Sequence, residues 1–190
     1  MERCAWCEGF DAYRQYHDLE WGVPLREPLA LYELLMLEGA QAGLSWATIL
    51  KKRDNYRRAF EGFDPEKIAR YDDRKVAQLL ADPGIVRNRA KVAAVVQNAR
   101  AYLEMRERGQ RFDTFLWDFV DGRARQNAWA TRDAVPASTA QSDAMSKALK
   151  KLGFKFVGST ICYAFMQSAG LVNDHVTTCF RHEQVRALAG

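Results

Sequence analysis

Cysteine and histidine side chains stand at the two ends of this sequence, and both residue types bind divalent metals such as zinc. Cys4 and Cys7 form a Cys-x-x-Cys pair, and His17 follows them. His175 and Cys179 are four residues apart, a spacing that on a helix would put both side chains on one face. Six donors are available for a tetrahedral site, and spacing alone favours the set Cys4, Cys7, His175 and Cys179 over sets with His17 or His182.

A metal bound by four protein side chains has no open coordination position, so this site would be structural. It would hold the two ends of the chain together and would not activate water. Two alternatives remain at this point. Either no metal binds, or Cys4 and Cys7 form a redox pair, although the βαβ context of a thiol oxidoreductase is missing. Cys162 lies in the apolar segment 161–165, where we expect a small buried thiol.

A carboxylate and several aromatic residues form a second group with chemical potential. Glu38 follows the apolar run 34–37, so we expect it to be partly desolvated, and a glycine-punctuated loop leads on to Trp46. Tyr13, Tyr16 and Trp21 add further rings near the start of the chain. A carboxylate among aromatic rings suits a cationic planar ligand, because the rings attract the cation and the carboxylate accepts its N–H donors. The alternative is a helix-end acid beside core aromatic residues.

The elements that must position these residues are helices. Apolar residues recur at intervals of three and four over residues 89–107, which predicts a helix with one buried face. Sequence patterns of alternating polarity are absent, so we predict an all-α fold. Further helices are expected after Pro28, after an N-cap at Ser45, from Asp64-Pro65, behind Ser142 up to Gly153, and from about Ile161 to Gly170, with a break at Asp82-Pro83-Gly84. Residues 121–141 are expected to be a long surface connection.

Length and charge limit the class of protein. The chain has 190 residues, a length that fits one domain (1–190). This domain could consist of two helical lobes with a pocket between them. No apolar run approaches the length of a membrane helix and no secretory signal is visible, so we expect a cytoplasmic protein without a membrane partner. A net charge of +4 permits a nucleic-acid partner without requiring one. Lysine and arginine residues gather in three segments, near residues 51–58, 87–91 and 147–155.

Long motifs give a more specific indication. Four motifs closely resemble those of the 3-methyladenine DNA glycosylase I family. They are Glu38-Gly39-x-Gln41-Ala42-Gly43-Leu44-Ser45-Trp46, Tyr16-His17-Asp18-x-Glu20-Trp21-Gly22, Gly153-Phe154-Lys155-Phe156-Val157-Gly158 and Gly170-Leu171-Val172-Asn173-Asp174-His175. The resemblance covers the chain from Arg3 to about Cys179. It implies the fold of the helix-hairpin-helix DNA glycosylases. It also implies an enzyme that removes a damaged base from double-stranded DNA containing alkylated bases. It also implies an N-glycosyl hydrolase of DNA base-excision repair that works without a partner subunit.

The resemblance also assigns residues. It implies that Cys4, His17, His175 and Cys179 bind a structural zinc, so that His17 replaces Cys7 in the set favoured by spacing. It implies that Glu38 and Tyr16 hydrogen-bond the extruded 3-methyladenine, that Trp46 stacks on it, and that Tyr13 and Trp21 line the pocket. Glu38 is then the candidate catalytic residue.

The resemblance assigns DNA contacts to the hairpin at residues 153–158, with Gly153, Lys155 and Gly158 at a phosphate. Leu44, in the loop before Trp46, is the candidate wedge that fills the vacated base stack. Relatives that cleave the strand carry a lysine just after the hairpin, whereas Ser159 and Thr160 stand here. We therefore expect a monofunctional enzyme without a Schiff base.

Two functional alternatives remain open. The first is a non-catalytic zinc-stapled DNA-binding module, in which Glu38 would be structural. The second is a glycosylase of the same fold with another methylated or deaminated base as substrate. Replacing Glu38 with glutamine separates the first alternative from an enzyme, because a binding module has no activity to lose.

Overall fold

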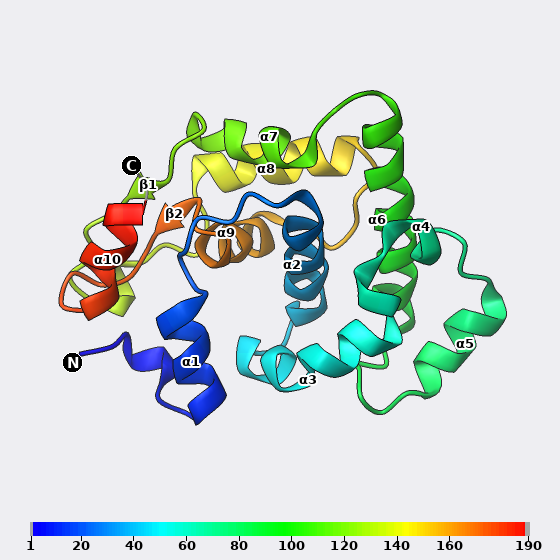
Figure 1. Ribbon diagram of the computed structural model, residues 1–190, viewed down its shortest axis with the longest axis horizontal. Helices are drawn as coiled ribbons and strands as arrows, with labels where there is room; N and C mark the ends of the chain where they lie inside the picture. Colours follow the sequence, from blue (N-terminus) through cyan, green and yellow to red (C-terminus); the bar gives the residue numbers. More distant parts are fainter. Residues whose placement is uncertain (1, 189–190) are drawn as a thin grey trace.

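Helix α2 (Pro28–Gln41) lies at the centre of the computed structural model, which describes residues 2–188 (Figure 1). It packs against α9 (Ser159–Ser168), α3 (Trp46–Ala59) and α7 (Phe112–Trp117). Most of its side chains are buried, and the run Leu35 to Ala40 is buried without interruption. A helix that is apolar nearly all round belongs in the interior of a protein, and this explains why Glu38, near its end, is also buried.

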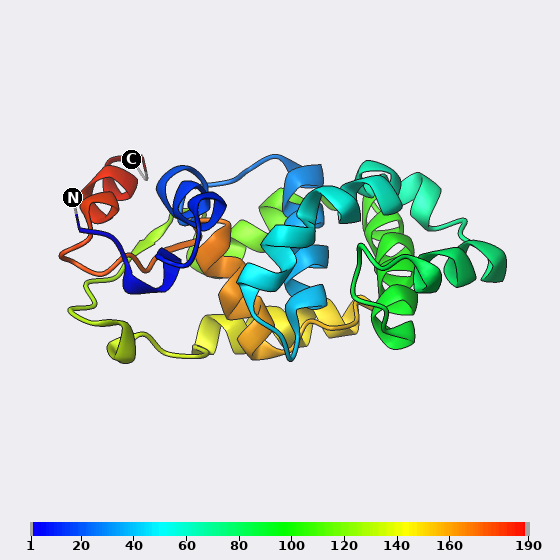
Figure 2. The same cartoon turned by 90° about the horizontal axis from the view of Figure 1, so that it is seen from below.

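The remaining helices surround α2. On one side lie α4 (Pro65–Ile68), α5 (Asp73–Ala81) and α6 (Arg89–Glu107), and on another lies α8 (Ala140–Lys151) beside α9 (Figure 1). Helix α1 (Asp11–Leu19) and helix α10 (Phe180–Leu188) lie together at the opposite end, close to both chain ends (Figure 2). The N–H of Phe180 donates to the carbonyl of Glu2 over 3.0 Å, so the two ends of the chain contact each other directly.

Short elements complete the fold. Two-residue strands β1 (Arg125–Gln126) and β2 (Val172–Asn173) pair in parallel. Four 3₁₀ turns are present within the described residues: η1 (Ala5–Cys7), η2 (Glu61–Phe63), η3 (Asp118–Val120) and η4 (Arg132–Ala134). The prediction of a helical fold is therefore confirmed, with one small parallel bridge added. Within residues 2–188, no helix has both the length and the apolar character needed to cross a membrane.

The local signals for several helices are confirmed. Ser45 accepts a hydrogen bond from the Thr48 N–H at the start of α3, and Asp64 caps α4 in the same way. Gly170 follows α9 with φ of +71°, and a Cβ atom there would lie 2.4 Å from the carbonyl carbon of Val23. Only glycine permits this close approach of two backbones.

Residues 121–141 are mostly exposed, as expected of a surface connection, and contain the short elements β1 and η4 before α8 begins. Two expectations about element boundaries were wrong. Helix α8 begins at Ala140 with Thr139 as N-cap, and Ser142 lies in its first turn, where it completes a capping box with Thr139. Helix α2 continues past Glu38 to Gln41, so Glu38 lies within its last turn and not at its end.

Candidate functional site

Four buried side chains from the two ends of the chain form a cluster that could hold a metal ion. The ligand atoms of Cys4, His17, His175 and Cys179 all lie within 4.8 Å of one another. The Cys4 Sγ lies 3.7 Å from the His175 Nδ1, and the Cys179 Sγ lies 3.4 Å from the His17 Nε2 and 3.6 Å from the His175 Nδ1. The pKa of Cys179 is lowered, and the contact with Cys4 is the main cause. A lowered pKa favours the thiolate form, which binds metals.

Neighbouring groups orient both histidine rings. The His17 Nδ1 lies 2.8 Å from the Asp18 carboxylate, which in turn accepts hydrogen bonds from Arg3. The His175 Nε2 lies 3.0 Å from the Trp21 carbonyl oxygen. Each contact uses one ring nitrogen as a donor and leaves the other, as an acceptor, directed at the cluster. Metal-binding histidines typically have such support.

The quartet expected from spacing alone is corrected by the structure, because His17 and not Cys7 joins the cluster. Cys7 lies in η1, and its Sγ donates to the Cys4 carbonyl over 3.2 Å. Burial raises its pKa to about 11. The expectation that His175 and Cys179 share a helix face was also wrong, because the segment between them is a turn that ends where α10 begins. His182 instead contacts the Asn127 carbonyl.

The carboxyl group of Glu38 is buried beside a single hydrogen-bond donor. Its side chain is 1% exposed, and Ser168, the last residue of α9, donates its hydroxyl to Oε1 over 2.6 Å. The other oxygen, Oε2, has no hydrogen-bond partner among the described residues. Burial raises the pKa of Glu38 to about 8, and the Ser168 bond offsets part of this effect.

Aromatic rings surround this region. The rings of Tyr16, on α1, and Trp46, the first residue of α3, have centroids 5.4 Å apart. Trp6, in η1, contacts Tyr13 and Trp21 with centroids 5.1 and 4.9 Å apart. Trp21 is also 4.6 Å from the ring of His175, so the aromatic group and the metal-ligand cluster are continuous.

Two cavities open beside these rings, and Trp46 lines both. One of about 540 Å³ is also lined by Trp6, Tyr13, Trp21 and Gln41. The other, of about 320 Å³, is also lined by Tyr16, Ser168, and the side chains of Arg53 and Glu20. Glu38 lines neither cavity. The first cavity collects the expected wall residues Tyr13 and Trp21, whereas Tyr16 belongs to the second.

Several buried polar atoms near the cavities have no hydrogen-bond partner among the described residues. They are the Tyr16 hydroxyl, the Glu38 Oε2, the Trp46 Nε1 and the Gln41 Oε1. Burial, followed by the charge of Glu38, raises the pKa of Tyr16 well above its ordinary value, so its hydroxyl keeps its proton. Unpartnered buried polar atoms are costly for a fold, and their gathering indicates a binding site.

Sequence reasoning missed two of these residues, whereas Gln41 lies in a motif that carries the family resemblance. Trp6 lies between Cys4 and Cys7, and its position in that segment was a usable signal. Ser168 offered no such signal as a site residue, because isolated polar residues in or beside apolar segments are common. Only the tertiary contact over 130 positions of sequence brings Ser168 to Glu38.

The loop between α8 and α9 contains the residues of the expected hairpin. Gly153 has φ of +93°, Lys155 is exposed, and Gly158 precedes α9 as its N-cap without a side-chain hydrogen bond. In the described part of the chain, no acceptor is found for the N–H groups of residues 156–158. Leu44 is 43% exposed in the loop between α2 and α3.

Several cations of the basic segments are engaged within the protein. Arg53 forms an ion pair with Glu20 at 2.6 Å, and Arg57 forms one with Glu33 at 2.7 Å. The Lys91 Nζ donates to the carbonyl of Ala40 over 2.9 Å, at the C-terminal end of α2. These cations of the basic segments are therefore held by contacts within the protein.

Comparison with known proteins identifies the family. The sequence model of the methyladenine glycosylase family matches residues 6–182. The DNA-3-methyladenine glycosylase 1 of Escherichia coli (strain K12) is 53% identical over 179 residues, which are 94% of this chain and 96% of that protein.

Solved structures agree. A crystal structure of 3-methyladenine DNA glycosylase I has a TM-score of 0.93 at 53% identity, over 94% of this chain and 98% of that one. A variant of 3-methyladenine DNA glycosylase I in complex with 3-methyladenine has a TM-score of 0.90 at 37% identity, over 95% and 97% of the two chains. The chain belongs to the methyladenine glycosylase family, whose enzymes are N-glycosyl hydrolases.

Proposed function

We propose that this protein excises 3-methyladenine from alkylated double-stranded DNA by hydrolysing its N-glycosidic bond. The observation that carries the proposal is the buried carboxyl group of Glu38, whose Oε2 has no hydrogen-bond partner among the described residues and whose charge acts on Tyr16, a ring 5.4 Å from that of Trp46. These are the groups that a planar cation requires. The names of the relatives point to the same base.

The chemistry explains why so little acid catalysis is needed. A base methylated at N3 is cationic while attached to the sugar, so it leaves as a neutral molecule and no proton must be supplied to it. The protein must instead extrude the nucleotide, at a cost of a few kcal/mol. Glu38 would then accept a hydrogen bond from the base and favour the cationic sugar that develops as the bond breaks.

Glu38 can act in this way only as a carboxylate. Its pKa of about 8 in the free protein means that most molecules hold the proton at pH 7. A cationic base beside it lowers that pKa and drives the proton off, whereas neutral adenine gives no such electrostatic gain. Because Glu38 is 1% exposed and lines neither cavity, neighbouring side chains must also move before a base reaches it.

Trp46 is proposed to stack on the base, with Tyr13 and Trp21 as further walls. Trp46 lines both cavities, which supports its role as the ring that a base meets on either side. Tyr16 is proposed to hydrogen-bond the base through a hydroxyl that has no other partner among residues 2–188. Trp6, which contacts both Tyr13 and Trp21, would support these walls.

DNA is proposed to bind the side of the molecule that carries the hairpin loop and the loop before α3, which lie on one side in Figure 2. The N–H groups around Gly158, the backbone at Gly153 and the side chain of Lys155 would contact phosphate, and exposed Leu44 would enter the base stack. Such binding weakens with salt concentration. The hairpin and the two helices that flank it support a helix-hairpin-helix assignment.

The reaction is proposed to end at the abasic site, without cleavage of the strand. The first residues of α9 are Ser159 and Thr160, so no amine stands there to form a Schiff base. The Ser159 hydroxyl is moreover engaged with Ser142 at 2.8 Å and with Asp143 at 2.5 Å.

The cluster of Cys4, His17, His175 and Cys179 is proposed to hold zinc. With Zn–S bonds of about 2.3 Å and Zn–N bonds of about 2.0–2.1 Å, a tetrahedral ion holds its sulfur and nitrogen ligands about 3.6 Å apart. Three of the four sulfur–nitrogen distances here are 3.7, 3.4 and 3.6 Å. Two thiolates and two imidazoles fill the four positions, so the ion would stabilise the fold and take no part in the reaction.

We expect the protein to act as a monomer of one domain on chromosomal DNA in the cytoplasm. The test is the release of free base from methylated duplex DNA, resolved by chromatography, with wild type beside Glu38→Gln. Wild type should release 3-methyladenine and not 7-methylguanine. The variant should be slower by between about tenfold and a hundredfold, because a charge-assisted hydrogen bond is lost.

A non-catalytic DNA-binding module would give a different result. Wild type would bind the methylated duplex and release no base, and the Glu38→Gln variant would bind equally well. Release of a different base by wild type would show that the protein is a glycosylase with another substrate.

A further inference from the structure

Asn98, in the middle of α6, is a buried polar residue that the proposed reaction does not use. It is 4% exposed, and both atoms of its side-chain amide bind the same residue of the hairpin loop. Its Oδ1 accepts from the Lys155 N–H over 2.7 Å, and its Nδ2 donates to the Lys155 carbonyl over 3.1 Å. One side chain thus satisfies both backbone groups of Lys155, as a neighbouring strand would.

The hairpin loop needs this support because its own conformation is unusual. Phe156, directly after Lys155, has φ of +54°, and Gly153 has φ of +93°. A bulky residue in the left-handed region is strained and persists only where its surroundings hold it. Asn98 holds the peptide groups on the N-terminal side of Phe156, and the Ser146 hydroxyl donates to the Val157 carbonyl over 2.6 Å on the other side.

These contacts determine which backbone groups of the loop stay available. The carbonyls of Lys155 and Val157 are turned inward to Asn98 and Ser146. The N–H groups of residues 156–158 have no acceptor in the described part of the chain, and α9 begins directly after them. Consecutive free N–H groups before a helix N-terminus form a concave site for an anion such as phosphate.

The same loop is packed against the helix that carries Glu38. A Cβ atom on Gly39, the neighbour of Glu38, would lie 3.4 Å from the Cβ and the carbonyl oxygen of Phe156. The Asn98 Nδ2 also lies 3.5 Å from the Met36 Sδ on α2. Helix α9 starts at this loop and ends at Ser168, which holds Glu38. The loop and the carboxyl group therefore belong to one rigid frame.

We propose that Asn98 is a positioning residue for DNA: it fixes the hairpin loop so that its free N–H groups grip a phosphate at a set place relative to Glu38. The inference rests on the proposed DNA contact of the loop. It assigns no contact between Asn98 and the DNA, since Asn98 is buried behind Lys155.

The test uses full-length, metal-loaded protein with Asn98→Leu, which keeps the size of the side chain and removes both hydrogen bonds. Val96→Ala, a buried change on the same helix, is the control for lost stability. Two affinities are measured for each protein well below its melting temperature: one for a duplex with an abasic-site analogue, and one for free 3-methyladenine by tryptophan fluorescence.

We expect Asn98→Leu to weaken binding of the abasic duplex by about tenfold, the loss of one to two hydrogen bonds, and to leave binding of the free base within twofold. The single-turnover rate at saturating DNA should fall less than kcat/KM. A purely structural role for Asn98 would lower both affinities together, and Val96→Ala shows how much lost stability alone changes them. Equal DNA affinity in Asn98→Leu and wild type would overturn the proposal.

A second variant separates this outcome from failure of the proposed DNA contact itself. Gly158 has φ of −61°, and no atom lies within 4 Å of a Cβ built on it, so Gly158→Glu should fold and yet repel phosphate, whereas Gly158→Ala should bind DNA. If Gly158→Glu binds DNA normally, the loop is not the phosphate site. If only Gly158→Glu is impaired, the loop binds phosphate and Asn98 does not position it.

Discussion

The buried carboxyl group of Glu38 should make this protein less stable at high pH, and replacing it with glutamine should remove that loss. The pKa of Glu38 rises from 4.5 to about 8 on folding because of burial. A group whose pKa is higher in the folded state contributes its full stability below the unfolded pKa and loses it as the pH rises to the folded value. The loss therefore develops between about pH 4.5 and pH 8.

The magnitude follows from about 1.4 kcal/mol per pKa unit. The ionisable carboxyl group costs about 2 kcal/mol of unfolding free energy at pH 6 and between about 4 and 5 kcal/mol at pH 9. Glutamine at this position is uncharged at every pH, and its side-chain oxygen can still accept the hydrogen bond from Ser168. The stability advantage of Glu38→Gln over wild type should thus grow by about 2–3 kcal/mol between pH 6 and pH 9.

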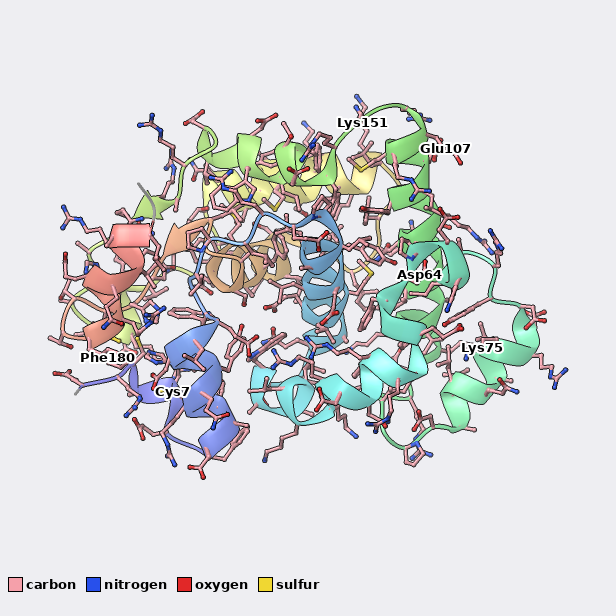
Figure 3. The ribbon with its side chains drawn as sticks, viewed as in Figure 1. Cys7, Asp64, Lys75, Glu107, Lys151 and Phe180 are labelled. Atoms are coloured by element: carbon pink, nitrogen blue, oxygen red, sulfur yellow. The ribbon has the colours of Figure 1, made fainter. Side chains whose placement is uncertain are left out.

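Thermal unfolding of both proteins across this pH range provides the assay. For a chain of this length, the difference in melting temperature should widen by between about 5 and 10 °C. Glu107→Gln, at the exposed end of α6 (Figure 3), is the matched control for the loss of one carboxyl group. A difference for Glu38→Gln that changes with pH no more than that of the control would refute the raised pKa, and with it the account of why cationic bases are preferred.

Three further predictions concern single groups. Ser168→Ala should raise the pKa of Glu38 further and move the acid limb of the kcat/KM profile up by about one pH unit, whereas Ser168→Thr should leave the limb where it is in wild type. An acid limb that is unchanged in Ser168→Ala would contradict the hydrogen bond between Ser168 and Glu38. Removing the metal with a chelator should lower the melting temperature by more than about 10 °C. Metal analysis should find the ion lost in His17→Ala and kept in Cys7→Ser. Equal melting temperatures of the metal-free and metal-bound protein would exclude a stabilising metal. Lys91→Met should cost between about 1 and 3 kcal/mol in denaturant unfolding, because the last carbonyls of α2 lose a charged donor, and a neutral effect would count against that role.

Much of the fold could be predicted from the sequence because its signals are local. Ser45 and Asp64 cap the helices that follow them, and Gly170 ends α9, all as the residue types indicate. The start of α8 was misjudged because Thr139 and Ser142 are both good caps, and only the hydrogen bonds distinguish them. Strand β1 was missed since a two-residue bridge has no period to detect.

The site was less predictable where it depends on contacts between distant segments. Spacing favoured Cys7 as a ligand, but the turn of η1 directs its sulfur to the Cys4 carbonyl. His17 could be preferred only through family resemblance, because nothing local relates it to His175. Asn98 carries no sequence signal either, since asparagine within a long helix is ordinarily exposed, and its importance comes from the loop that folds onto it.

The burial of all four cysteine thiols has a consequence for survival under alkylating attack. Methylating electrophiles that damage purine nitrogens also react with thiolates, which are softer and stronger nucleophiles. Cys4 and Cys179 are each 3% exposed, and Cys7 and Cys162 are fully buried. Burial also raises the pKa of Cys7 to about 11 and that of Cys162 to about 12, so both remain unreactive thiols (Figure 3 labels Cys7 beside α1). A repair enzyme built in this way offers no accessible thiol, within residues 2–188, to the reagents whose damage it removes, and we expect it to keep its activity while they are present.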